Sequence, residues 1–183
     1  KYGSFSLSEK SGYLSAGNYL IGANIFFLKE ILLNIGGFNS KLGMKGDLLG
    51  YGEETQVQKL IYNKKSHKIF YSIDLYVYHV VRRQKMNFLW LIKSYFANGK
   101  DSSLIFLENP KFKKFIYKEF LISIFLIFFK FCCFYVSLFK GLLLRKRSEY
   151  PNFKNYFYEK SLKYIGEIGF SFGKLKLFML KNK

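Results

Sequence analysis

The chain has 183 residues, of which half are hydrophobic and 21% are aromatic, and its net charge is +18. This composition excludes a disordered chain, because disordered chains are poor in apolar and aromatic residues. A disulfide-stabilised fold is also excluded, because the two cysteines, Cys132 and Cys133, are adjacent and neighbours rarely bridge. The length permits one or two domains.

The positive charge favours anionic partners such as phosphate groups, lipid head groups or nucleic acid, without choosing among them. It is also what an AT-rich coding sequence produces, since Lys, Asn, Ile, Phe and Tyr are all heavily used. No RNP-like, KH, helix-turn-helix or zinc pattern is present, so we expect no nucleic-acid partner.

The charge is unevenly distributed along the chain. Residues 1–110 carry 14 basic and 8 acidic residues, a net charge of +6, whereas residues 111–183 carry 16 and 4, a net charge of +12. The pair Asn109-Pro110 favours a turn between these parts. We therefore expect an α/β domain over 1–110, followed by a basic, hydrophobic helical tail over 111–183.

Two helices are predicted in the first half of the α/β domain. Apolar residues at helical spacing predict an amphipathic helix over 28–35, which the Gly36-Gly37 pair would end with positive φ angles. Residues 38–52 contain four glycines and predict an irregular segment. A second helix should begin near Glu53.

Two strands and a further helix are predicted next. Residues 67–73 and 75–81 are rich in Ile, Tyr, Phe and Val, which is typical of strands. A helix should then run from about 87 to 98 and stop at Gly99.

The tail contains a candidate membrane segment over 120–139, long enough to cross about 30 Å of hydrocarbon. Its apolar residues contribute roughly −0.3 to −0.6 kcal/mol each and the central Lys130 costs about 3 kcal/mol, so the sum favours insertion. Basic residues flank both sides and give no orientation. An interfacial segment on anionic lipid heads fits equally well. The third alternative is a buried core helix, in which Lys130 and Lys140 would be poorly accommodated.

The scarce acids are more informative than the abundant bases. The three aspartates, Asp47, Asp74 and Asp101, are too far apart in sequence for a DxD metal motif. Glu53 and Glu54 stand at a predicted helix start, where the helix dipole keeps a carboxylate ionised and suits it to act as a general base. A first-turn glutamate is also a common helix starter.

His79 ends the second predicted strand and is followed by Arg82 and Arg83. One imidazole and two guanidinium groups at a strand end are suited to hold a metal and a diphosphate. The alternatives are a hydrogen-bonded surface histidine and a solvated run of charges. Neither His79 nor His67 has a cysteine or histidine at zinc spacing.

Several motifs together resemble the C-terminal half of family 2 glycosyltransferases, which have the GT-A (Rossmann-like) fold. In chain order they are Gly22-Ala23-Asn24, a helix, Gly36-Gly37-Phe38, a glycine-rich segment, Gly52-Glu53-Glu54-Thr55 and a strand ending in Tyr78-His79-Val80. The segment 94–101 resembles the aromatic-x-x-G-R-S ending of that family, with Lys in place of Arg. The resemblance covers about residues 20–103.

The resemblance implies an inverting transfer of a sugar from a nucleotide-sugar donor, in which one base takes the proton of the acceptor hydroxyl. It places Glu54 at the position of that base, often Asp in the family, and Glu53 as the acid that orients the acceptor or the base. His79 matches the histidine near the metal and diphosphate, while Asn24, Arg82 and Arg83 are expected to bind substrate.

The resemblance also implies a divalent cation, Mg²⁺ or Mn²⁺, which would offset charge on the leaving diphosphate. The nucleotide-binding half of the family and its DxD metal motif precede the matched region and are not visible here. We therefore expect the chain to be a fragment that alone neither binds a nucleotide sugar well nor turns over.

The tail resembles the apolar, basic segments that hold such enzymes at the cytoplasmic face of the inner membrane, either associated with it or crossing it once. The expected acceptor is a cell-envelope polysaccharide or a lipid-linked glycan, and the expected surface partner is an anionic membrane. The alternative function is a non-catalytic membrane-associated module or partner subunit.

Overall fold

The computed structural model describes residues 6–64, 67–107, 116–144 and 150–181. Contacts divide the chain into two compact units. Unit 1 comprises residues 1–43 and 52–83, and unit 2 comprises residues 44–51 and 84–183. The boundary expected at Asn109-Pro110 lies outside the described residues. The contacts divide this part of the chain between Arg83 and Gln84. The helix over Phe88–Leu107, expected in the α/β domain, is therefore in the same unit as the tail.

Both helices described in unit 1 begin close to where local signals predict them, and the first also ends where predicted. They are α1 (Lys29–Asn34) and α2 (Glu53–Lys64). The predicted stop after α1 is confirmed, because Gly36 and Gly37 have φ angles of 89° and 74°. Apolar residues of α2 form the core of unit 1 with Ile69, and the apolar face of α1 packs against it; the buried members are Val57, Ile61 and Ile69.

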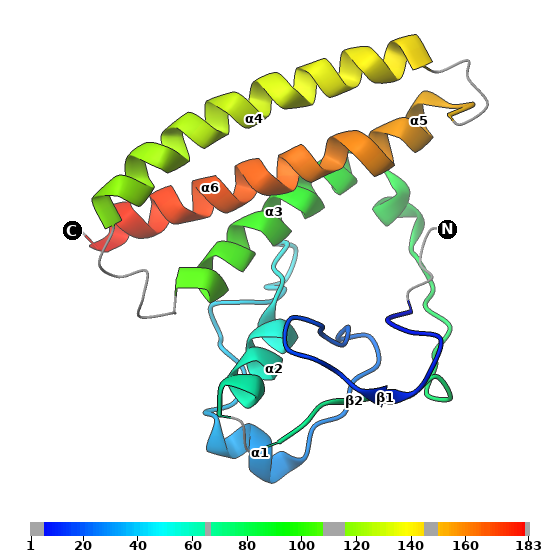
Figure 1. The fold of residues 1–183 in the computed structure, drawn as a ribbon, viewed down its shortest axis with the longest axis vertical. Helices are drawn as coiled ribbons and strands as arrows, with labels where there is room; N and C mark the ends of the chain where they lie inside the picture. The colour runs from blue at the N-terminus through cyan, green and yellow to red at the C-terminus, as the bar shows by residue number, and fades with distance from the viewer. Residues whose placement is uncertain (1–5, 65–66, 108–115, 145–149, 182–183) are drawn as a thin grey trace. The chain divides into compact units, whose positions relative to one another are not determined.

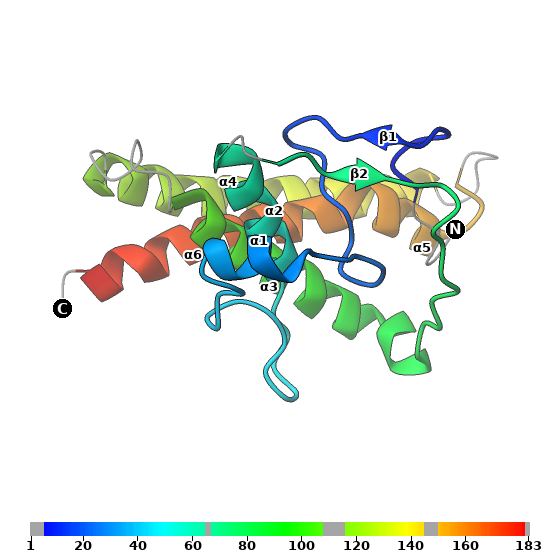
Figure 2. The same ribbon diagram turned by 90° about the horizontal axis from the view of Figure 1, so that it is seen from below.

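Unit 1 contains one small sheet among the described residues. Strands β1 (Gly12–Tyr13) and β2 (Phe70–Tyr71) lie side by side and antiparallel, as Figure 2 shows. In their register Gly12 is opposite Tyr71. The prediction over 67–73 is therefore confirmed only at its centre. The strand predicted over 75–81 is wrong, because no described segment hydrogen-bonds alongside that stretch as a strand neighbour would. The GT-A fold stays a prediction.

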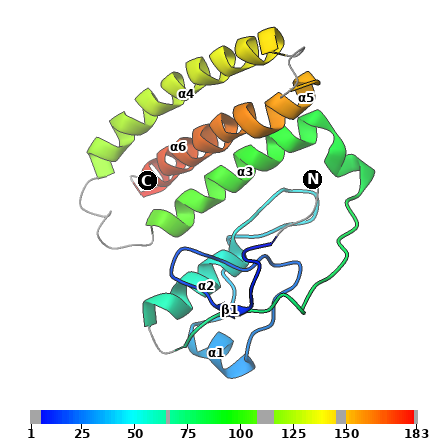
Figure 3. The same ribbon diagram turned by 45° about the vertical axis from the view of Figure 1, so that its right-hand side comes forward.

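Unit 2 consists mainly of three long helices, α3 (Phe88–Leu107), α4 (Ile116–Leu144) and α6 (Leu162–Lys181). Figures 1 and 3 show α6 between α3 and α4. A 3₁₀ turn (Arg83–Met86) precedes α3, and a short helix α5 (Phe153–Tyr156) with a π-helical turn (Phe157–Ser161) leads into α6.

The helix α3 passes through Gly99, so the predicted stop there is wrong. The reason is a close approach of two helix backbones that only glycines permit. A Cβ on Gly99 would overlap the carbonyl oxygen of Gly166 on α6, and a Cβ on Gly169 would overlap the carbonyl oxygen of Phe96 on α3. The glycine serves helix packing and does not end the helix.

The pairing of α4 with α6 uses polar groups. Lys130 Nζ lies 2.7 Å from Glu167 Oε2, and Lys174 Nζ lies 2.7 Å from Glu119 Oε2. Lys130, the charged residue that interrupts the apolar segment of α4, therefore forms an ion pair with a carboxylate on α6.

The segment 44–51 is anchored on α3 through Tyr51. Its backbone N–H donates to Asp101 Oδ2 at 3.0 Å, and its hydroxyl lies 2.6 Å from Ser94 Oγ. Asp101 is only 3% exposed and also pairs with Lys100 at 3.2 Å. The motif over 94–101 therefore fastens the part of the glycine-rich segment that directly precedes Gly52.

Candidate functional site

The first turn of α2 positions the two adjacent acids. Gly52 adopts a φ of 93°, and its carbonyl accepts the backbone N–H of Gln56 at 2.8 Å, which makes Gly52 the residue that opens the helix. Glu53 and Glu54 follow in the first turn, where unpaired backbone N–H groups and the helix dipole stabilise carboxylates. The predicted helix start is confirmed.

Glu54 contacts the first glycine of the Gly22-Ala23-Asn24 motif. The backbone N–H of Gly22 donates to Glu54 Oε1 at 3.3 Å. A Cβ on Gly22 would lie 3.0 Å from that oxygen and 3.1 Å from Glu54 Cδ, closer than most Cβ contacts. Two motifs separated by about thirty residues in sequence thus meet at one carboxylate.

Glu53 has a different neighbour. Its carboxylate packs against the backbone of Gly43, where a Cβ would lie 2.8 Å from Glu53 Cδ. Gly43 has a φ of 79°, a conformation that side chains rarely adopt. The orienting role expected of Glu53 stays a prediction, and its observed contact is with the glycine-rich segment.

Gln58 is a site residue that sequence reasoning missed. Its fully buried amide accepts the N–H of Leu20 at 2.7 Å and donates to the carbonyl of Leu20 at 2.9 Å, and also to the carbonyl of Glu54 at 3.1 Å. It therefore ties the chain just before Gly22 to the helix that carries Glu54. The available signal was its position one helical turn after Glu54.

A second side chain of α2 supports the same segment of unit 1. The hydroxyl of Tyr62 donates to the carbonyl of Leu14 at 3.1 Å. Burial is the main reason that the pKa of Tyr62 is raised, with a smaller contribution from Tyr19. Its phenol therefore remains a protonated donor through the physiological pH range.

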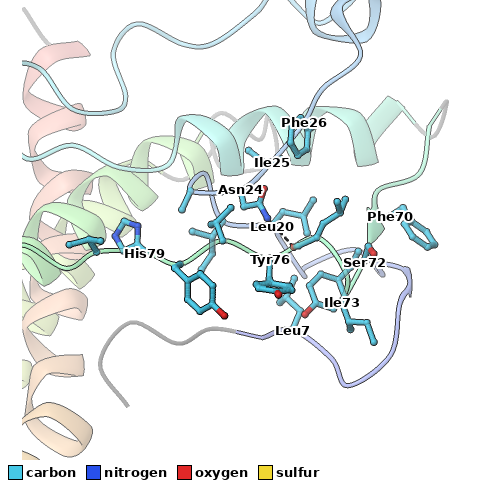
Figure 4. Close-up of a pocket in the computed structure, with 17 residues that line it drawn as sticks. Leu7, Leu20, Asn24, Ile25, Phe26, Phe70, Ser72, Ile73, Tyr76 and His79 are labelled. Carbon is cyan, nitrogen blue, oxygen red and sulfur yellow. Dashed lines mark hydrogen bonds between the residues drawn. The ribbon is translucent and has the colours of Figure 1, made fainter.

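A groove of about 950 Å³ in unit 1 contains Asn24 and His79 (Figure 4). The segments over 20–26 and 70–80 form its walls, and Asn24 Nδ2 joins them by donating to the carbonyl of Leu75 at 2.9 Å. Its other side chains are mostly apolar or aromatic, and the volume is in the range of sites for small ligands. The stretch predicted as a strand is therefore one wall of a groove.

The two predicted basic residues lie outside this groove. Arg82 and Arg83 are exposed and do not line it, and His79 is exposed at its rim. The structure thus brings Asn24 and His79 to one groove and Glu54 to Gly22, while it leaves the arginines on the surface of unit 1. Their role toward a diphosphate stays a prediction.

The described residues do not supply the donor set of a metal site. Among residues 6–64, 67–107, 116–144 and 150–181, no three His, Cys, Asp or Glu side chains lie together in a way that could hold an ion. His79 would be one ligand of the predicted divalent cation, and a single imidazole does not make a site. The described residues alone therefore do not form a site for the predicted cation.

Comparison with known proteins gives one distant relative. Over 90 residues, which are 49% of this chain, the sequence is 28% identical to glucosyl-dolichyl phosphate glucuronosyltransferase of Haloferax volcanii. The match covers 29% of that protein, so the chain corresponds to less than a third of its length. No family model and no solved structure matches the chain.

Proposed function

We propose that this chain forms the acceptor side of a glycosyltransferase that moves a sugar from a nucleotide-sugar donor to a lipid-linked or cell-envelope acceptor. The observation that carries the proposal is the contact between Glu54, at the start of α2, and the backbone of Gly22. The distant relative is a transferase whose name includes a dolichyl phosphate, which supports glycosyl transfer in general terms.

In the proposed reaction the Glu54 carboxylate accepts the proton of the acceptor hydroxyl. The acceptor oxygen forms a bond to the anomeric carbon as the bond from that carbon to the donor diphosphate breaks, so the configuration inverts. The diphosphate leaves with the bonding electron pair. His79, Arg82 and Arg83 would stabilise the charge that grows on it.

The groove beside Asn24 is the proposed place of the acceptor. Its lining includes Tyr76 and Tyr78, whose rings pack edge to face with their centroids 5.7 Å apart. Aromatic surfaces are therefore available to a glycan or an isoprenoid chain. The amide nitrogen of Asn24 donates a hydrogen bond to the carbonyl of Leu75, so the amide oxygen is the atom that an acceptor hydroxyl can bind. We place the enzyme at the cytoplasmic face of the inner membrane.

The proposal is tested by assaying the intact protein in detergent with a panel of labelled nucleotide sugars and polyprenyl-phosphate or glycosylated polyprenyl-phosphate acceptors. We expect label to enter the lipid phase with one donor class. A folded protein that binds vesicles and transfers no sugar from any donor would contradict the proposal and favour the non-catalytic membrane module.

Substituting Gly22→Ala should separate catalysis from stability. The new Cβ would push the Glu54 carboxylate away from the Gly22 backbone, and a misplacement of about 1 Å can cost roughly 100-fold in rate. The carboxylate is the end of a flexible side chain, so we expect the free energy of unfolding to change by less than about 1 kcal/mol. Steady-state kinetics and denaturant melts measure the two effects.

The matched control is Gly12→Ala, because a Cβ on Gly12 meets no atom within 4 Å. We expect this variant to keep its activity. Unchanged turnover in Gly22→Ala, or equal losses in both variants, would show that the contact between Gly22 and Glu54 does not serve catalysis.

A further inference from the structure

One face of α4 is apolar, exposed and free of charge along most of its length. Between Lys118 and Lys140 no charged residue of α4 is exposed. We call this the outer face of α4, and its large exposed side chains are Leu121, Ile124, Phe125, Phe128, Phe129, Phe131, Tyr135, Val136 and Phe139. The helix is long and apolar enough to cross a membrane, and only 11% of its most apolar window is buried, which argues against a soluble core helix.

The opposite face of α4 carries its polar groups, and these meet α6. Glu119 pairs with Lys174, Lys130 pairs with Glu167, and Ser137 Oγ lies 2.8 Å from Ser161 Oγ at the turn before α6. These contacts follow α4 from Glu119 to Ser137, about five helical turns. They place α6 along the polar side of α4. Figure 1 shows that the two helices run antiparallel.

This pairing of α4 with α6 distinguishes the two membrane arrangements that the sequence leaves open, namely a helix that crosses the bilayer and a helix that lies in the plane of its surface. If α4 crossed the bilayer, the part of α6 beside it would lie in the hydrocarbon as well. That part carries Lys163, which is exposed, as well as Glu167, which is 45% exposed in its ion pair. Each charge at the bilayer centre costs about 2.5–3.5 kcal/mol on insertion scales, so a spanning arrangement is disfavoured.

We propose that α4 lies in the plane of an anionic membrane surface, with its outer face among the upper acyl chains and α6 on its water side. An amphipathic helix in this position buries its apolar face about 5–10 Å below the head groups. Lys118 and Lys140 are exposed at the two ends of the outer face and reach the phosphates with their ammonium groups. The net charge of +12 over residues 111–183 favours anionic lipid.

The orientation is measured by the depth of nitroxide labels in the intact protein, bound to phosphatidylcholine vesicles that contain phosphatidylglycerol. One label uses the native Cys132 on the outer face, with Cys133→Ser; the others use Leu121→Cys or Leu143→Cys with both native cysteines changed to serine. The outermost positions are about 33 Å apart along the helix. Collision with oxygen and with a water-soluble nickel complex reports the depth.

An in-plane helix places the three labels at similar depth, about 5–10 Å. A deep central label with two shallow outer ones would show a spanning helix and overturn the proposal. Nickel accessibility at all three positions would overturn it as well, and would assign the outer face to another protein or a second copy. The label depths do not depend on sugar transfer, so a failure of the in-plane proposal would leave the proposed transferase function unaffected.

A pair of serine substitutions tests the same surface through binding. Phe128 on the outer face is 71% exposed, and Leu89 on α3 is 65% exposed. We expect Phe128→Ser to weaken binding to the anionic vesicles at least about tenfold and Leu89→Ser to leave it unchanged. Equal binding by the two variants, with circular dichroism showing both folded, would contradict the lipid contact.

Discussion

Replacing Glu54 by Gln should abolish sugar transfer while the affinity for the nucleotide-sugar donor stays nearly unchanged. The glutamine keeps the size of the side chain and an oxygen that can accept the N–H of Gly22, but it cannot take a proton from the acceptor hydroxyl. Loss of a general base typically lowers the rate by 10²–10⁴-fold. Turnover is measured in the intact protein, and donor affinity by calorimetry.

Glu53→Gln is the matched variant one residue earlier. Its carboxylate packs on Gly43, whereas the Glu54 carboxylate accepts the N–H of Gly22, so we expect a smaller loss of turnover than in Glu54→Gln. Full activity in Glu54→Gln would exclude it as the base. A loss in Glu53→Gln that exceeds the loss in Glu54→Gln would transfer the role to Glu53. Thermal melts of both variants show whether folding contributes.

The helices of unit 1 were predictable because their signals are local. The apolar spacing and the Gly36-Gly37 pair define α1, and Gly52 followed by two acids defines the start of α2. These features act within one or two helical turns. Their outcome therefore depends little on what packs against them.

The predictions that failed depend on contacts distant in sequence. Gly99 has the composition of a helix stop, but its position against Gly166 keeps α3 helical for a further two turns. The stretch 75–81 has the composition of a strand, but a strand also needs a neighbour that hydrogen-bonds to it. Neither condition can be read from the residues themselves.

In the candidate site, too, the residues that were predicted differ in kind from those whose roles become clear only from contacts distant in sequence. Glu54 and the Gly22 motif were identified through the resemblance, and their contact agrees with one site. Gln58 was not identified and the anchoring role of Asp101 was not predicted, because an interior amide and an isolated aspartate become informative only when their partners, Leu20 and Tyr51, are known. Both bind backbone groups, which carry no sequence signal.

Gly99→Ala should destabilise unit 2 strongly, whereas Gly166→Ala in the same helix contact should stabilise it slightly. A Cβ on Gly99 would overlap the Gly166 carbonyl oxygen and lie 2.8 Å from its carbon and 3.0 Å from Phe170 N, which are backbone atoms that cannot rotate away. Overpacking of this kind costs about 1–3 kcal/mol or more. The helix propensity that alanine adds, up to about 1 kcal/mol, offsets only part of that cost.

A Cβ on Gly166 meets its nearest atoms, Tyr95 O and Cδ1, at 3.6 and 4.0 Å, which is ordinary contact, so only the propensity gain remains. Urea unfolding of the chain, followed through its single tryptophan, Trp90 on α3, measures both free energies. Equal stabilities of the two variants would show that α3 and α6 are not packed backbone to backbone. Both variants gain the same helix propensity, so the expected difference between them is the overpacking cost alone, about 1–3 kcal/mol or more. It arises because the contact is asymmetric: a Cβ on Gly99 would meet the carbonyl of Gly166, whereas a Cβ on Gly166 would lie 3.6 Å from the carbonyl oxygen of Tyr95.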